Sequence, residues 1–257
     1  MSKMTLTKAD SCRGDLILVS PGFALKEEPD TKTMFPATSR QPDVRLNAKA
    51  SRLLQRLLES IQAGDQIIAV SGFRPRAEQE QIWNNSMKEN GSEFTHQFVA
   101  VPGHSEHETG LAIDLGENKP PIDFICPSFP YRGICQRFRE KAPQFGFIER
   151  YKRGMEPVTG ISAEPWHFRY VGFPHSAVIT EKGMTLEEYI SFLKRITDQK
   201  HPYCYQNEKI KVEIFYLPIQ EMEEIILPED DPHQMSGTNE GGVVISVWRT
   251  ENGRKTI

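Results

Sequence analysis

Apolar residues recur at helical spacing between positions 46 and 61, and a short apolar run follows them. The helical positions are Leu46, Ala50, Leu53, Leu54, Leu57, Leu58 and Ile61. Side chains spaced in this way share one face of an α-helix, so the segment predicts an amphipathic helix. Gly64 marks its C-terminal end. Residues 66–72 are mostly apolar and end in a glycine, which predicts a buried strand.

Two later segments alternate between faces, as half-buried strands do. Residues 111–115 place three aliphatic side chains on one face and Asp114 on the other. Residues 166–170 place His167 and Arg169 on one face and three aromatic side chains on the opposite face. Each strand therefore has an apolar face for the core and a polar face suited to form the floor of a site.

Weaker patterns predict the remaining elements. Strands are expected at residues 15–20, 211–217 and 243–248, helices directly after Pro75 and near residues 134–142 and 186–196, and loops at the polar residues 84–96, 228–232 and 236–242. The chain contains no internal repeat.

Composition limits the class of protein. With 257 residues the chain is one large domain, or one domain with an appendage. Its net charge of −4 argues against a nucleic-acid partner. Four scattered cysteines, Cys12, Cys126, Cys135 and Cys204, do not predict a disulfide framework. The polar N-terminus lacks a signal-like run and no stretch is long enough to span a membrane, so we expect a cytoplasmic protein without a membrane anchor.

His107, Asp114 and His167 are the candidate metal ligands. Asp114 lies within an apolar run, where a carboxylate is costly unless it is paired or bound to a metal. His167 lies between two aromatic residues, and a lone histidine there is more often a core residue that has found a partner. Two imidazoles and one carboxylate together make the three protein ligands of a catalytic zinc site.

Glu164 and Arg74 complete the candidate chemistry. Glu164 precedes His167 by three residues across a proline, a turn that can bring it beside a metal without making it a ligand. Arg74 ends the strand at 66–72, where it can stabilise an oxyanion. The alternatives are a surface glutamate and a solvent-facing arginine at the start of a helix.

Other catalytic motifs are absent, and one basic cluster stands apart. His107 begins like an H-E-x-x-H zinc helix, but position 111 is Leu. The sequence contains no G-x-S-x-G, P-loop or G-x-G-x-x-G motif. Arg150, Lys152 and Arg153 read as a solvated face, with contact to an anionic substrate as the alternative.

Three motifs resemble those of the zinc D,D-peptidases of the VanX, VanY and VanXY types and follow one another in the same order. Along the chain they are Ser71-Gly-Phe-Arg74-Pro, Ser105-x-His107-x-x-Gly110-x-Ala112-x-Asp114 and Glu164-Pro-Trp-His167. The resemblance covers roughly residues 14–196. It implies an α+β fold in which helices flank a central antiparallel sheet, as in the hedgehog-like fold, and this agrees with the predicted elements. A small β-rich C-terminal extension follows.

The resemblance also implies a role for each candidate residue. His107, Asp114 and His167 would bind Zn²⁺. Glu164 would take a proton from the attacking water and deliver it to the leaving amine, and Arg74 would stabilise the oxyanion. Ser105 and, on the helix after Arg74, Gln81 would bind substrate.

The implied activity is the removal of C-terminal D-Ala. The expected substrates are the D-Ala-D-Ala dipeptide and the UDP-linked pentapeptide precursor, whose loss contributes to vancomycin resistance. The missing N-terminal anchor points to the cytosolic bifunctional type. Two alternatives remain: an L,D- or endolysin-type peptidase of the same fold, and a zinc-binding module that has lost catalysis. We expect a peptidase domain at residues 1–198 and an extension at 199–257, whose role stays open together with the oligomeric state.

Overall fold

Four antiparallel strands form the sheet that carries the candidate residues. In the computed structural model these strands are β4 (Ile67–Ser71), β5 (Ala112–Glu117), β6 (Phe147–Tyr151) and β7 (Glu164–Tyr170). Their order in the sheet is β4-β5-β7-β6. The strands predicted at 66–72, 111–115 and 166–170 are therefore confirmed, and so is the α+β fold with a central antiparallel sheet.

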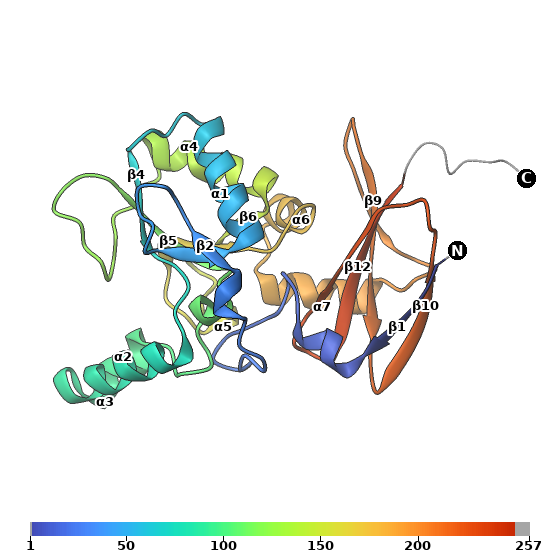
Figure 1. The fold of residues 1–257 in the computed structure, drawn as a ribbon, viewed down its shortest axis with the longest axis horizontal. Helices are drawn as coiled ribbons and strands as arrows, with labels where there is room; N and C mark the ends of the chain where they lie inside the picture. Colours follow the sequence, from blue (N-terminus) through green and yellow to red (C-terminus); the bar gives the residue numbers. More distant parts are fainter. Residues whose placement is uncertain (1, 250–257) are drawn as a thin grey trace, which may run out of the picture. The chain divides into compact units, whose positions relative to one another are not determined.

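The structure describes residues 2–249, and these divide into two compact units. The larger unit, Val19–Thr185, holds the four-stranded sheet. Its other elements are η2 (Thr31–Thr33), β2 (Met34–Pro36), β3 (Arg45–Asn47), α1 (Ala48–Ser60), α2 (Arg76–Glu89), α3 (Gly91–Phe98), η3 (Glu106–Thr109), α4 (Gly133–Lys141), η4 (Ala142–Phe145), α5 (Glu156–Thr159) and α6 (His175–Lys182), of which Figure 1 labels the main ones. The smaller unit is described separately below.

Strand register decides which side chains share a face of the sheet. Asp114 on β5 lies directly opposite His167 on β7, and their neighbours Ile113 and Phe168 form the next pair. Because side chains alternate along a strand, the polar pair and the apolar pair project from opposite faces. The site and the hydrophobic core are thus the two faces of the same strands.

Aromatic side chains fill the core face. Phe129, Phe138 on α4 and Phe168 meet edge to face, with ring centroids 4.8 to 5.6 Å apart. Such pairs contribute roughly 0.5–1.5 kcal/mol beyond the burial of their area. Helix α1 buries Ala50 and Leu54, as its periodic pattern predicts. This packing holds β5 and β7 in register from behind the site.

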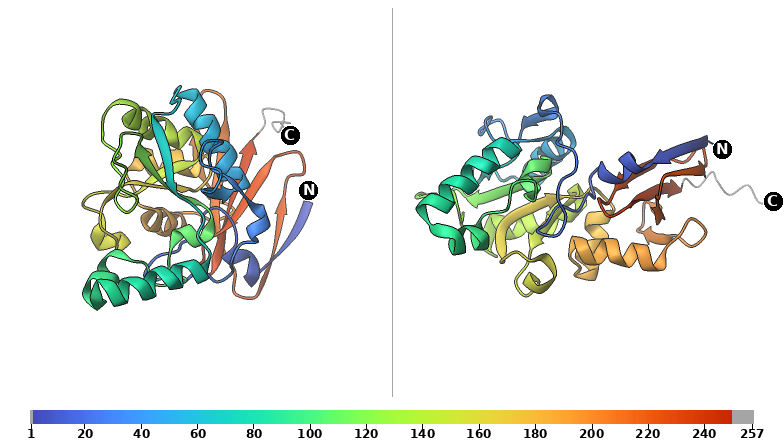
Figure 2. Two further views of the ribbon diagram at one scale, coloured as in Figure 1. Left: turned by 60° about the vertical axis from the view of Figure 1, so that its left-hand side comes forward. Right: turned by 90° about the horizontal axis from the view of Figure 1, so that it is seen from below.

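The loop predicted at residues 84–96 is wrong. Helix α2 continues to Glu89, and α3 begins at Gly91; the two helices lie side by side in Figure 1 and in both views of Figure 2. Between the helices, the hydroxyls of Ser86 and Thr95 are buried and lie 2.8 Å apart. Trp83 of α2 also meets His96 of α3 edge to face, with ring centroids 5.1 Å apart. Polar side chains make much of this contact, so no apolar period marks residues 84–96 as helical in the sequence.

The smaller unit is rich in strands. Within the described part of the chain it comprises residues 2–18 and 186–249. Its elements are β1 (Ser2–Thr7), η1 (Lys8–Cys12), α7 (Leu186–Ile196), β8 (Tyr203–Gln206), β9 (Lys211–Pro218), β10 (Met222–Leu227), β11 (His233–Gly237) and β12 (Gly242–Arg249). Strands β1 and β10 form one antiparallel pair, and a second sheet has the order β11-β12-β9-β8. The predicted strands at 211–217 and 243–248 and the helix at 186–196 are confirmed, whereas β11 occupies the start of the loop expected at 236–242.

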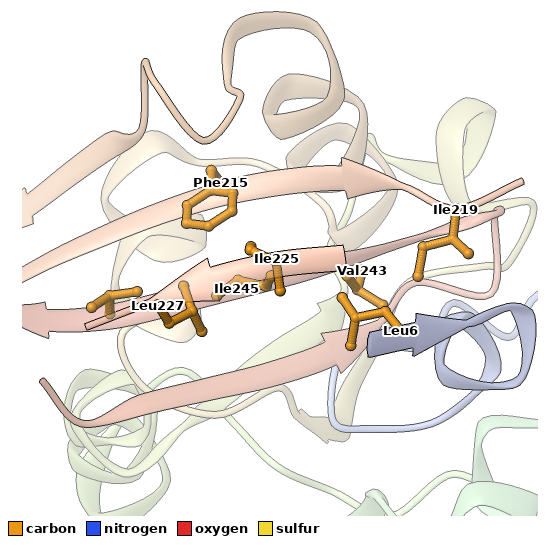
Figure 3. Close-up of a cluster of buried hydrophobic side chains, with 8 residues drawn as sticks. Leu6, Phe215, Ile219, Ile225, Leu227, Val243 and Ile245 are labelled. Atoms are coloured by element: carbon orange, nitrogen blue, oxygen red, sulfur yellow. The ribbon is translucent and has the colours of Figure 1, made fainter. Parts of the chain in front are cut away.

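The two sheets of this unit share one apolar core. Leu6 and Ile225 from the first sheet pack with Phe215, Val243 and Ile245 from the second (Figure 3). Burying one such side chain contributes roughly 1.5–3 kcal/mol. The cluster ties the start of the chain to strands more than 200 residues later.

The boundary between the units differs from the one expected at residue 198. Strand β1 pairs with β10, so the first residues of the chain belong with the C-terminal strands. Helix α7 also belongs to this unit and contacts β9. Residues 250–257 of the expected extension lie outside the described residues.

The strand predicted at residues 15–20 is also wrong. The segment is buried but irregular, with a single bridge from Ser20 to Phe23. The Leu16 amide donates to the Ser236 hydroxyl, and the Leu18 amide donates to the Thr238 carbonyl. Apolarity correctly indicated burial here, but partners other than a strand ladder satisfy the backbone.

Candidate metal centre and active site

Asp114 and His167 meet across the β5–β7 pair. Their register places them opposite each other, and Asp114 Oδ1 lies 3.0 Å from His167 Nδ1. His167 is 3% exposed, so the contact is shielded from water. The register of β5 and β7 therefore brings together two residues that the sequence places on the polar faces of their strands.

The short turn η3 brings His107 to the same carboxylate. Its Nε2 lies 3.2 Å from Asp114 Oδ2. The turn ends at Gly110, which has a φ of 69°, and a Cβ added there would lie 2.6 Å from the sulfur of Met34. Only glycine accepts both the left-handed conformation and this close approach. The glycine of the motif thus directs the chain from His107 into β5.

One ligand atom from each of His107, Asp114 and His167 lies within 4.8 Å of the other two. The two imidazole rings stand edge to face, with centroids 5.0 Å apart. Two imidazole nitrogens and one carboxylate oxygen are ligands that suit zinc, and three protein ligands leave a position open for water or substrate. The donor set and its spacing fit a catalytic zinc ion.

The outward nitrogen of each ring has its own acceptor. His107 Nδ1 lies 2.8 Å from the Gly72 carbonyl oxygen, which can only accept, so Nδ1 carries the proton and Nε2 is free for a metal. His167 is reversed, because its Nδ1 faces Asp114 and its Nε2 lies 3.3 Å from Glu106 Oε2. Ring nitrogens of metal-binding histidines usually have such partners.

Glu106 is a buried residue of the site that the sequence reading missed. Arg150 Nε and Arg169 donate to its Oε1 at 2.8 and 2.9 Å. Burial alone raises the pKa of Glu106, but the charges of Arg150 and Arg169 outweigh it and hold that pKa well below its usual range. The interpretation of Arg150 as part of a solvated face is therefore wrong, since Arg150 is buried beside Glu106.

Glu164 lies at the start of β7, beside the ligand cluster. Its Oε2 is 3.6 Å from His167 Nδ1, and its side chain is 29% exposed. Burial raises the pKa of Glu164 to about 7; nearby His167 opposes this shift, and the negative charges of Asp114 and Glu106 add to it. A carboxyl group with this pKa can both take up and release a proton near neutral pH.

Arg74 follows β4 and is held in place by two side chains. It donates to Gln79 Oε1 at 2.7 Å and to the Ser71 hydroxyl at 3.1 Å. Ser71 lies opposite Asp114 in the β4–β5 pairing. The Arg74 amide also donates to the His107 carbonyl at 3.1 Å. These bonds anchor Arg74 to β4, the neighbour of the strand that carries Asp114, and to the turn that carries His107.

The two expected substrate contacts differ in their surroundings. Ser105 is buried at the start of η3, and its amide donates to the carboxylate of Glu108 at 3.3 Å. Gln81 lies on the solvent-exposed side of α2, whereas Gln79 is buried, contacts Arg74 and donates to the Ala100 carbonyl. Gln79 lies four residues after Pro75, one helical turn, and therefore on the same face of α2 as the end of the chain that enters from Arg74. Helical spacing would for this reason have favoured Gln79 over Gln81.

Comparison with known proteins identifies the family. A model described as VanY, D-alanyl-D-alanine carboxypeptidase, matches residues 43–173, a range that contains all three ligand candidates together with Arg74 and Glu164. The chain belongs to this VanY family. It is also 41% identical over 185 residues to VanXYC of Enterococcus gallinarum, a bifunctional D-Ala-D-Ala dipeptidase and carboxypeptidase, with 72% of this chain and 97% of that protein aligned. These matches confirm the resemblance that the three motifs indicated.

Solved structures extend the VanY-family match beyond the peptidase unit. The D,D-dipeptidase VanXYg, solved with a phosphinate analogue of D-Ala-D-Ala, superposes with a TM-score of 0.92 and 44% identity, covering 96% of this chain and 99% of that one. The β-rich smaller unit therefore has a counterpart there. A variant of the D,D-pentapeptidase VanY from a VanB-type cassette, solved with Zn(II), matches with a TM-score of 0.51 and 27% identity over 68% of this chain and 98% of that one.

Two further properties of the chain are visible in the structure. Among the helices of residues 2–249, none combines the length and the apolar character required to cross a bilayer. The four cysteines are free, as the absence of a disulfide framework in the sequence predicts.

Proposed function

We propose that this protein is a zinc-dependent D,D-peptidase that removes C-terminal D-Ala from the D-Ala-D-Ala dipeptide and from the UDP-linked pentapeptide precursor. The observation that carries the proposal is the cluster of His107, Asp114 and His167, whose ligand atoms lie within 4.8 Å of one another beside Glu164. Family membership and the similarity to VanXYC and VanXYg support the substrate class. Loss of these precursors contributes to vancomycin resistance, and the enzyme would act in the cytoplasm, where they are made.

Zinc is the metal that we propose for this cluster. When bound, the ion supplies a Lewis acid for the scissile carbonyl and lowers the pKa of water. Two imidazole nitrogens and an ionised Asp114 suit it. Burial raises the pKa of Asp114, but the charges of His107 and His167 and their hydrogen bonds to the carboxylate outweigh burial and keep that pKa below its usual range. The similarity to a VanY structure that contains Zn(II) supports this choice.

Glu164 is the proposed general base and acid. It lies beside the ligand cluster but is not one of the three ligand candidates, so it is available to accept the proton of the attacking water. It then gives that proton to the leaving amine of D-Ala. A pKa of about 7 serves both steps at neutral pH.

Arg74 is the proposed oxyanion contact. Its guanidinium is fixed by Gln79 and Ser71, so its direction does not change as charge develops on the carbonyl oxygen. Preorganised donors of this kind stabilise transition states more than ground states. Ser105, next to the turn that carries His107, is proposed as a substrate contact.

Release of D-alanine from defined substrates tests the function. Purified, zinc-loaded protein is given the dipeptide, the UDP-linked pentapeptide and the corresponding tetrapeptide, with a chelated sample as control. Chelator-sensitive release from the first two substrates, with none from the tetrapeptide, supports the proposal. Release from the tetrapeptide alone supports an L,D-peptidase. No release of D-alanine by folded, zinc-loaded protein supports either an endolysin-type peptidase that cuts a different peptide bond or a zinc-binding module without catalysis.

A further inference from the structure

Glu106 contacts three groups at once inside the larger unit. Its side chain is fully buried, its Oε1 accepts from Arg150 and Arg169, and its Oε2 lies 3.3 Å from His167 Nε2. Both arginines donate to Oε1, and Oε2 is the oxygen that faces the imidazole. The two charged hydrogen bonds to Oε1 therefore fix the carboxylate group, and with it the position of Oε2, before any metal binds.

The ring of His167 has a defined direction in this setting. Its Nδ1 faces the carboxylate oxygens of Asp114, at 3.0 Å, and Glu164, at 3.6 Å. Nε2 lies on the far side of the ring, toward Glu106. A neutral imidazole carries one proton, so the nitrogen that donates to an acceptor leaves the other nitrogen free to bind a metal.

We propose that Glu106 is a positioning residue of the zinc site, which accepts Nε2–H of His167 and so holds the unprotonated Nδ1 toward Asp114. The inference rests on the proposed function, because it assigns Glu106 to the same site. Glu106 does not contact the substrate or the reacting atoms in this role. It acts through the ring of His167, as the Gly72 carbonyl acts through the ring of His107.

The variant Glu106→Gln separates this role from simple packing. The amide has nearly the same volume, and its oxygen remains toward Arg150 and Arg169, which only donate. The NH₂ group then faces His167 Nε2 and can only donate to it. Nε2 must accept, so the ring proton moves to Nδ1, where it blocks the nitrogen that faces Asp114.

Glu108→Gln is the matched control. Glu108 lies two residues away in the same turn, is equally buried, and accepts from the Gly103 amide and from Arg76. No histidine is among these partners. A change of zinc affinity that is specific to Glu106→Gln therefore reports the contact with His167 and not the general condition of the turn.

Competition with a chromogenic chelator measures the zinc Kd of the wild-type, Glu106→Gln and Glu108→Gln proteins. The expected result is a Kd about 10- to 100-fold higher for Glu106→Gln and unchanged for Glu108→Gln. An unchanged Kd for Glu106→Gln, or equal losses in both variants, would overturn the inference. Thermal unfolding of each chelated protein confirms that it is folded.

Nitrogen-15 NMR of zinc-loaded wild-type protein gives a second readout that needs no variant. A proton on Nε2 of His167, with zinc-type shifts on Nδ1, supports the assignment; zinc on Nε2 overturns it. Failure of wild-type protein to bind zinc or to release D-alanine contradicts the proposed function itself. Normal wild-type binding and release, with no change in Glu106→Gln, contradicts only the role of Glu106.

Discussion

His107 and His167 present opposite ring nitrogens to the carboxylate between them. His107 offers Nε2 at 3.2 Å from one oxygen of Asp114, and His167 offers Nδ1 at 3.0 Å from the other. The difference follows from their elements, since His107 comes from a turn and His167 from a strand directly opposite Asp114. The two rings approach the Asp114 carboxylate from different directions. The nitrogen of each ring that faces away from Asp114 therefore needs its own hydrogen-bond acceptor.

Replacing Glu164 separates metal binding from turnover. In Glu164→Ala we expect the zinc content to stay at the wild-type level, because Glu164 is not one of the three ligand candidates. The kcat for D-alanine release should fall roughly 10²- to 10⁴-fold with the loss of the general base. Metal analysis and steady-state kinetics measure the two quantities, with the exposed Glu89→Ala as control. Wild-type turnover in Glu164→Ala would reject the base assignment.

Replacing Arg74 tests the oxyanion contact. Arg74→Ala should lower kcat by about 10²- to 10³-fold, because a preorganised donor is lost. Gln79→Leu should lower kcat less, since Arg74 remains but loses its 2.7 Å bond, and Gln81→Leu should have the smallest effect. Kinetics on the pentapeptide substrate rank the variants. A larger loss in Gln81→Leu than in Gln79→Leu would show that the glutamine expected from the sequence is the relevant one.

Removing the Glu106 carboxylate should destabilise the fold. Glu106→Ala leaves the buried Arg150 and Arg169 without this counter-charge, and breaking a buried ion pair from one side costs roughly 3–5 kcal/mol. Glu106→Gln should cost less, because its oxygen still accepts from the arginines. Urea unfolding of the chelated proteins measures both. A loss below about 1 kcal/mol in Glu106→Ala would contradict the role of this cluster in stability.

His175 should make the protein sensitive to acid. Burial lowers the pKa of His175 to about 3, so the folded protein keeps it neutral, while the unfolded chain takes up a proton below about pH 6.5. Stability is therefore fully present above pH 6.5 and is lost as the pH falls toward 3, by about 1.4 kcal/mol per unit. Because the pKa of Glu164 is raised to about 7, its contribution to stability increases as the pH falls from 7 to 4.5, opposite to that of His175. The contribution of His175 must therefore be measured as a difference between two proteins.

The matched comparison is chelated wild-type protein against His175→Leu, unfolded with urea at a series of pH values. Contributions from Glu164 and other groups cancel in the difference. The wild-type protein should lose about 2 kcal/mol more than His175→Leu between pH 6.5 and 5. Parallel pH profiles for the two proteins would contradict the assignment of a neutral, buried His175.

Local patterns in the sequence predicted the residues that alternate or follow a motif. The faces of the strands at 111–115 and 166–170 follow from alternation alone, which places Asp114 and His167 on the polar face of each strand. Their meeting across the β5–β7 pair was indicated by the motif resemblance and not by alternation. Glu106 could not be found in this way, because its arginine partners lie 44 and 63 residues away and nothing local marks its burial. Pairing between distant segments is decided by tertiary packing.

The same reason explains the errors in the fold. The first strand pairs with β10, more than 200 residues later, so no local signal assigns it to the smaller unit. The helices at 76–98 bury small polar side chains between them, and the apolar period that normally reveals a helix is missing. Residues 15–20 give the opposite error. Their apolar run is typical of a strand, but the segment is buried without a strand partner.

Anomalous diffraction at the zinc edge, from crystals of zinc-loaded protein, tests the central claim most directly. The account predicts one strong peak about 2.0–2.2 Å from His107 Nε2, from an Asp114 carboxylate oxygen and from His167 Nδ1, with Glu164 close by but not coordinated. A peak elsewhere, or a zinc ion bound through His167 Nε2 or through Glu164 in place of Asp114, would contradict the account.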